Sequence, residues 1–172
     1  KIPLQHWCYL DDKHETKLPI DDSDGGCDCL PKCSTKTKMD RHQVAVIKME
    51  KGDAITASAE AFYLMKQRGI KNVIVMGVHT NMCVLGRPFS IRQMVYQGQN
   101  VVLMRDLTDT MYNPRMRPFV SHFRGTDLIV EHIEKFWCPT ITSVDFVGNK
   151  IFKSYKTKKN TLYVPGYWSI IM

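Results

Sequence analysis

The sequence predicts an α/β fold: a doubly wound parallel sheet flanked by helices in three layers. Two apolar runs, Val73–Met76 and Val101–Met104, show no alternation, which is typical of strands buried on both faces of a parallel sheet. Stretches with helical spacing separate these runs from each other and from further strand candidates. In a doubly wound sheet the functional site lies beyond the carboxyl ends of the strands.

Length and composition indicate one globular domain with an extension at each end. The chain has 172 residues, of which 44% are hydrophobic and 24% charged, an ordinary balance for a globular protein. No apolar run approaches the ~18 residues that a membrane-spanning helix needs, so no membrane span is expected. An aromatic content of 10% excludes a wholly disordered chain.

The first extension, residues 1–43, is acidic and contains cysteines. It has neither a helical nor a strand period and holds several prolines and glycines, so an irregular segment is predicted. Three cysteines lie close together in it, at Cys27, Cys29 and Cys33. Structural thiols, disulfide-bonded or not, are favoured over a metal site, because no second cluster of cysteine or histidine has matching spacing. The cellular compartment stays open.

The second extension, residues 148–172, is basic and supplies most of the net charge of +7. It contains no acidic residue and five lysines, at Lys150, Lys153, Lys156, Lys158 and Lys159. Such a tail can hold nucleic acid or an anionic surface. No recognition motif accompanies the lysines, so a solvated extension is favoured and no nucleic-acid partner is expected.

The α/β domain is predicted to span 44–147 and to begin with a strand at 44–49. Apolar residues then recur at helical spacing over 54–68. Gly69 is placed to end this helix at the C′ position. A second helix is expected over 82–97, between the two buried strands.

Two features shape the predicted second and third helices. Pro88 removes a hydrogen bond and crowds the preceding turn, which predicts a short turn at 83–86 and a fresh helix starting at Pro88. The buried strand Val101–Met104 is expected to close at Arg105 and Asp106. After a loop at 107–123, a third helix is expected to be capped by Thr126 or Asp127 and to run to Phe136. A last short strand is expected at 141–144.

Cys83 is the best candidate nucleophile by position. It opens a predicted helix directly after a buried strand, where free backbone N–H groups and the helix dipole favour the thiolate. A buried structural cysteine is an equally good interpretation from position alone. Three other cysteine chemistries each fail at one residue. A tyrosine phosphatase would carry Arg where this chain has Phe89, and a rhodanese would carry Arg where it has Pro88. A thioredoxin would carry its second Cys where this chain has Gly86.

The run GVHTNMCV at Gly77–Val84, with the strand before it, resembles the signature of the isochorismatase-like cysteine hydrolases, which include nicotinamidases and N-carbamoylsarcosine amidases. The resemblance covers roughly 44–143, and an acidic segment like Asp21–Asp28 precedes the domain in bacterial members. It implies a parallel-sheet α/β fold and attack by Cys83 on an amide or related carbon of a small molecule. No cofactor is expected, because neither a G-x-G-x-x-G nor a Walker sequence occurs.

The resemblance also implies how the site is built. A cis peptide bond is expected between Val78 and His79, with the backbone N–H groups of His79 and Cys83 stabilising the oxyanion. His79 is expected either to contact substrate or to cover the cysteine. Asn81 is a further candidate for substrate binding.

Two of the three triad residues of that family, Asp, Lys and Cys, are hard to place. The Asp ends an apolar strand upstream, and no strand of this kind occurs in 1–43. The spacing from Cys83 places the lysine near Glu50, between Lys48 and Lys51. Lys51 is preferred because it lies past the strand at 44–49, but a solvated surface residue is the favoured interpretation of either lysine. No metal is expected, because the histidines are scattered, at His6, His14, His42, His79, His122 and His132.

Two hypotheses follow for the function. In the first, the protein is a cysteine hydrolase of a small amide, with Cys83 and Lys51 in its site. In the second, it is a catalytically impaired member of the fold that serves as a binding or assembly module. The missing strand with its Asp leads us to expect a fragment with weak activity and an exposed sheet edge, which favours a homo-oligomer.

Overall fold

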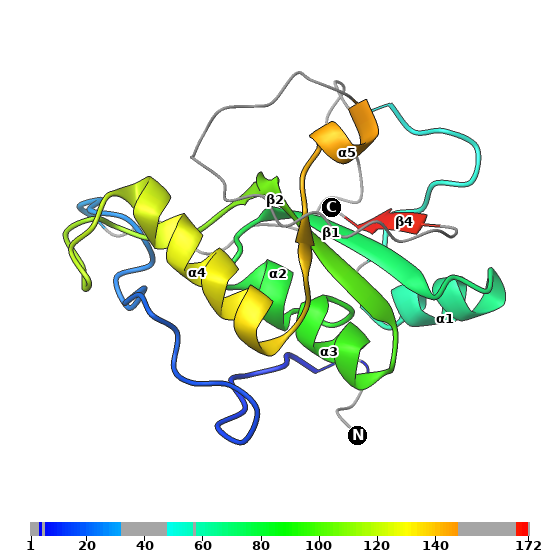
Figure 1. Cartoon of the computed structure of the whole chain (residues 1–172), viewed down its shortest axis with the longest axis horizontal. Coiled ribbons are helices and arrows are strands. Elements are labelled where there is room, and N and C mark those ends of the chain that lie inside the picture. The colour runs from blue at the N-terminus through cyan, green and yellow to red at the C-terminus, as the bar shows by residue number, and fades with distance from the viewer. Residues whose placement is uncertain (1–3, 5, 32–47, 57, 148–167, 172) are drawn as a thin grey trace.

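The computed structural model describes residues 4, 6–31, 48–56, 58–147 and 168–171. Within them the chain forms a parallel sheet in the order β3-β2-β1-β4 (Figure 1). Its strands are β1 (Asn72–Val78), β2 (Asn100–Asp109), β3 (Thr140–Ile141) and β4 (Trp168–Ile171). The helices are α1 (Glu60–Gln67), α2 (Cys83–Gly86), α3 (Ile91–Tyr96), α4 (His122–Phe136) and α5 (Val144–Val147). The predicted α/β fold with a parallel sheet is thus confirmed.

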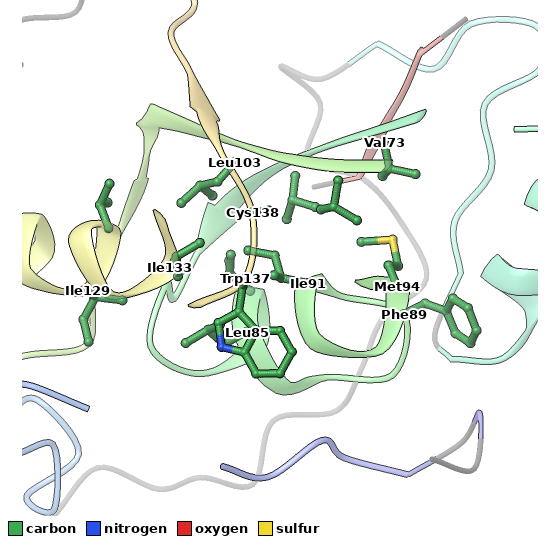
Figure 2. Packing of buried hydrophobic residues seen from close by; sticks show 14 of the residues in the cluster. Val73, Leu85, Phe89, Ile91, Met94, Leu103, Ile129, Ile133, Trp137 and Cys138 are labelled. Carbon is green, nitrogen blue, oxygen red and sulfur yellow. The ribbon is translucent and has the colours of Figure 1, made fainter. Parts of the chain in front are cut away.

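The two apolar runs form the centre of the sheet, buried on both faces as predicted. Val73, Ile74 and Val75 are 0%, 1% and 2% exposed. On one face, the side chains of β1 and β2 pack against the helices (Figure 2). This cluster includes Val73, Leu85, Phe89, Ile91, Met94, Leu103, Ile129, Ile133 and Trp137. Each such buried side chain stabilises the fold by about 1.5–3 kcal/mol relative to an exposed one.

A smaller buried cluster lies on the other face of the sheet. Its members are Ile74, Val102, Met104 and Ile141, with Met76 packed against them. All five come from β1, β2 and β3, so both faces of these strands carry apolar side chains. None of the helices in the described residues is long and apolar enough to cross a membrane.

The beginning of the domain differs from the prediction. Residues 44–47 of the expected first strand lie outside the described residues, and Lys48 and Met49 are exposed and form no strand. The first helix, α1, is shorter than the predicted 54–68. It ends as expected: Gly69 takes a left-handed conformation (φ 65°), and its N–H donates to the carbonyl of Lys66, as in a Schellman motif.

The predicted second helix is divided by its proline, as expected. Helix α2 covers only Cys83–Gly86, and α3 begins at Ile91 rather than at Pro88. The later start is explained by Phe89, which takes a positive φ of 58° and cannot be helical. Its N–H donates to Oε1 of Gln93 at 2.7 Å, which fixes the first turn of α3.

Helix α4 and the strands on either side of it were predicted with wrong boundaries. β2 continues to Asp109 instead of ending near Asp106, and β3 is only Thr140–Ile141. α4 begins at His122, because the hydroxyl of Ser121 caps it by accepting from the N–H of Arg124 at 3.2 Å. The predicted caps, Thr126 and Asp127, therefore lie inside the helix.

The described part of the N-terminal extension, 6–31, has no helix or strand, yet it is closely packed on the domain. The N–H of Cys8 donates to the carbonyl of Gly86 at 2.7 Å. A Cβ at Gly86 would lie only 2.6 Å from Nε1 of Trp7, so the segment crosses α2 at a distance that only glycine allows. The C-terminal extension includes β4, which pairs with β1.

Glu15 attaches this N-terminal segment to α3 and α4 in the interior. Its carboxylate lies 2.6 Å from Nε of Arg92. It also accepts from Nε2 of His132 at 2.7 Å and from Nε1 of Trp137 at 2.9 Å. Burial raises the pKa of Glu15, but these hydrogen bonds and the charge of Arg92 outweigh that effect and lower the pKa to about 2.

Candidate active site

The cysteine turn, residues 79–83, connects β1 to α2 and is fixed to the end of β2. The N–H of Thr80 donates to the carbonyl of Asp109 at 2.8 Å. The Thr80 hydroxyl donates to that of Thr108 at 2.7 Å, and Thr108 donates in turn to the carbonyl of Gly77 at 2.8 Å. Thr80 is fully buried, so these bonds hold the turn firmly at the carboxyl edge of the sheet.

Cys83 lies at the end of this turn as the first residue of α2, and it is partly exposed. Two other cysteines in the described residues, Cys8 and Cys138, are buried. Burial raises the pKa of both, to about 12 for Cys138. Cys83 is thus more accessible than these two thiols.

The helix that Cys83 opens is short, as Pro88 predicts. α2 has four residues, Cys83–Gly86, which matches the short turn expected at 83–86. A macrodipole is the sum of aligned peptide dipoles, so a single turn supplies only a small part of it. The support for a thiolate from the helix dipole is therefore weaker than the sequence indicated.

The two backbone donors expected near Cys83 are free of partners in the described structure. Among the backbone hydrogen bonds between described residues, none uses the N–H of His79 or of Cys83. The peptide bond between Val78 and His79 is cis, as the resemblance implies. His79 is half-buried, and Val78 is 59% exposed. Within the described part of the chain, neither N–H group therefore has a backbone acceptor.

Asn81, predicted to bind substrate, is buried and hydrogen-bonded to two other segments. Its Nδ2 donates to Oδ2 of Asp22 at 2.7 Å and to the carbonyl of Met111 at 3.1 Å. Its Oδ1 accepts from the N–H of Met111 at 2.8 Å. Since both of its donor hydrogens and its oxygen have protein partners, the amide joins the cysteine turn to the segments of Asp22 and Met111.

Lys51, the predicted lysine of the site, is exposed in a turn between Glu50 and Asp53. This turn lies in the segment 48–56, drawn in cyan in Figure 1, which leads toward α1. None of the hydrogen bonds or ion pairs between described residues joins a lysine or a carboxylate to the thiol of Cys83. The described structure thus brings together the turn residues of the predicted site but shows no contact of Lys51 with them.

A histidine and an aspartate that sequence reasoning missed lie at the same edge of the sheet. Nε2 of His122 is 2.9 Å from Oδ1 of Asp109, and Nδ1 is 2.8 Å from the carbonyl oxygen of Tyr112. Burial lowers the pKa of His122, but its hydrogen bonds to Asp109 and Tyr112 outweigh that effect and raise it. Because both ring nitrogens face acceptors, the geometry favours the imidazolium.

The sequence did not reveal this pair, because the predicted end of β2 lay three residues before Asp109. The sequence ended the strand at Asp106 and placed Asp109 in a loop, so the aspartate did not count as a strand-end residue. His122 was then one of several scattered histidines. A strand extended to Asp109 would have placed the carboxylate beside the cysteine turn.

In the described part of the chain, no group of three or more His, Cys, Asp or Glu side chains is arranged to hold a metal ion. No protein-family model, curated protein or solved structure matches the chain.

Proposed function

We propose that the protein is a cysteine hydrolase that cleaves an amide-type C–N bond of a small molecule, with Cys83 as nucleophile. The proposal includes the doubly wound, three-layer arrangement of the isochorismatase-like hydrolases. The observation that supports it best is the place of Cys83: a partly exposed thiol on a firmly held turn beyond the carboxyl end of β1. This edge is where open α/β sheets bind their ligands.

In the proposed reaction, the thiol of Cys83 gives its proton to a carboxylate base, which the resemblance implies. The sulfur then attacks the carbonyl carbon, a C–S bond forms, and the carbonyl oxygen becomes an oxyanion. The free N–H groups of His79 and Cys83 are suited to stabilise this charge, and one such donor typically lowers the barrier by about 3 kcal/mol.

The second half of the reaction restores the enzyme. The C–N bond breaks as the carbonyl re-forms, and the amine leaves with the proton that the base took from the thiol. Water then attacks the thioester, the C–S bond breaks, and the acid product is released while Cys83 regains its proton. In this proposal Lys51 keeps the place that the resemblance gives it, as the cation of the site.

The reactivity of the thiol is tested first, because it requires no substrate. Limiting iodoacetamide at pH 7, followed by peptide mapping, should label Cys83 before Cys8 and Cys138, since those two are buried and their pKa values are raised. Labelling of Cys138 before Cys83 would contradict the assignment of the nucleophile.

Catalysis is tested with a panel of small amides. Cys83→Ala should lower the hydrolysis rate by at least about 10³-fold, as loss of a nucleophile does, and Cys29→Ser serves as the control. Mass spectrometry of the wild type under turnover should detect an acyl adduct on the peptide that contains Cys83. Equal hydrolysis rates for the wild type and Cys83→Ala would overturn the proposal. Lys51→Met is expected to lower the hydrolysis rate less than Cys83→Ala does.

A binding or assembly module is the second candidate function. It is favoured by one observation: within the described residues, no carboxylate or lysine contacts the Cys83 thiol. A module of this kind would bind the small amides of the panel without hydrolysing them, and Cys83→Ala would leave the affinity unchanged. Calorimetric titration of both proteins with the same panel separates the two functions.

A further inference from the structure

The acidic segment, Asp21–Asp28, lies against the loop that follows β2. The N–H of Asp21 donates to the carbonyl of Arg117 at 2.9 Å. Nδ2 of Asn113 donates to Oδ2 of Asp24 at 2.8 Å. These bonds join segments about ninety residues apart in the sequence, so the acidic segment forms one side of the region around the cysteine turn.

Asn81 extends this connection to the cysteine turn itself. It is 5% exposed and precedes Cys83 by two residues. One of its Nδ2 hydrogens is directed to Asp22 and the other to Met111, which in turn donates its own N–H to Asn81 Oδ1. The bond to Asp22, at 2.7 Å, is the shortest of the three.

We propose that Asp22 is a positioning residue: through Asn81, it holds the cysteine turn in the conformation that presents Cys83. This proposal rests on the proposed role of Cys83 as nucleophile. A buried amide that loses one acceptor must either stay unsatisfied, at the cost of its desolvation, or turn toward another partner. Asn81 cannot turn without breaking its two bonds to Met111, so the loss is transmitted to the turn.

The proposal makes Asp22 an acceptor of a hydrogen bond, not a source of charge. Asp22→Asn keeps an oxygen where Asn81 Nδ2 needs one, whereas Asp22→Ala removes it. A positioning role therefore predicts that the asparagine variant behaves like the wild type. A role as general base predicts that both variants lose function equally.

Asp24→Ala is the matched control. It removes a carboxylate on the same acidic segment that accepts from the amide of Asn113 at 2.8 Å and from the N–H of Gly26 at 2.8 Å. These bonds reach the loop after β2 and the acidic segment itself, and not the cysteine turn. The control thus separates a local effect on the turn from a general loosening of the acidic segment.

The experiment is amide hydrogen exchange followed by mass spectrometry, read on peptides that cover residues 78–86. Asp22→Ala should exchange about tenfold faster there than the wild type, because a buried hydrogen bond of this kind is lost. Asp22→Asn and Asp24→Ala should exchange at the wild-type rate. Unchanged exchange in Asp22→Ala, or equal acceleration in Asp24→Ala, would overturn the positioning role.

Measurements of kcat and KM distinguish a failure of this inference from a failure of the proposed function. With an amide that the wild type hydrolyses, Asp22→Ala should lower kcat about tenfold with a smaller change in KM, and Asp22→Asn should restore it. An equal loss in Asp22→Asn would overturn the inference in favour of a base. If neither wild type nor variant hydrolyses any amide, the proposed function fails, and the exchange experiment still decides on the position of the turn.

Discussion

The N-terminal segment is attached to the domain at two places that differ in burial and in chemistry. At Glu15, a charge is enclosed in the interior and compensated by an arginine, a histidine and an indole N–H. At Asp22, a half-buried carboxylate accepts one hydrogen bond from Asn81. The comparison teaches that one irregular segment serves two purposes, because the first attachment stabilises the fold and the second orients the cysteine turn.

The largest effect is expected from breaking the interior attachment. Glu15→Gln should lower the free energy of unfolding by about 3–5 kcal/mol, because it leaves the charge of Arg92 buried without its partner. Urea unfolding followed by circular dichroism measures this loss. Glu131→Gln is the control: it breaks an exposed ion pair with Arg124 and should cost no more than about 1 kcal/mol.

A second substitution, at Arg92, tests whether the loss of stability in Glu15→Gln comes from the unpaired charge of Arg92. In the double variant Glu15→Gln with Arg92→Met, both charges are gone, so part of the lost stability should return. A double variant less stable than Glu15→Gln alone would show that Arg92 stabilises the fold through contacts other than Glu15.

The pH dependence of stability is the next test of the interior attachment at Glu15. The pKa of Glu15 is lowered from 4.5 to about 2 in the folded protein, so its contribution is complete above about pH 4.5 and is lost as the pH falls toward 2. Acid unfolding of the wild type should therefore be steep in this range, and that of the Glu15→Gln variant shallower. Parallel curves for the two proteins would contradict the lowered pKa.

A smaller effect on stability, with the opposite dependence on pH, is expected at the carboxyl edge of the sheet. The pKa of His122 is raised above its ordinary value of 6.5, so its pair with Asp109 stabilises the fold at low pH and loses this effect as the pH rises through the folded pKa. The pair is partly exposed, so His122→Gln should cost only about 0.5–1 kcal/mol at pH 5.5 and less at pH 8.5. A cost that increases with pH would contradict this assignment.

The centre of the fold was predictable from the sequence because its signal is local. The runs Val73–Met76 and Val101–Met104 are continuous and apolar, and the structure buries them on both faces. The break at Pro88 was predictable because proline acts on its own helix. The start of α4 was not, because Ser121 caps the helix from within a stretch that has no helical period.

The site was predictable only where its residues are neighbours in sequence. The cysteine turn, 79–83, follows a strand whose pattern is plain, so the place of Cys83 could be inferred. The role of Asn81 depends on a residue 59 positions earlier, and that of Glu15 on partners more than a hundred positions later. Such pairings leave no periodicity in a single sequence.

The close crossing at Gly86 has a consequence for laboratory evolution of this protein. Any side chain there would collide with Nε1 of Trp7 at 2.6 Å and with the carbonyl oxygen of Cys8 at 3.0 Å. A side chain at this position would therefore force Trp7 and the backbone of Cys8 to shift, so a random library that includes Gly86 would lose this crossing in most members. Diversity is better placed at exposed positions such as Val78 and Phe119, which take no part in the crossing.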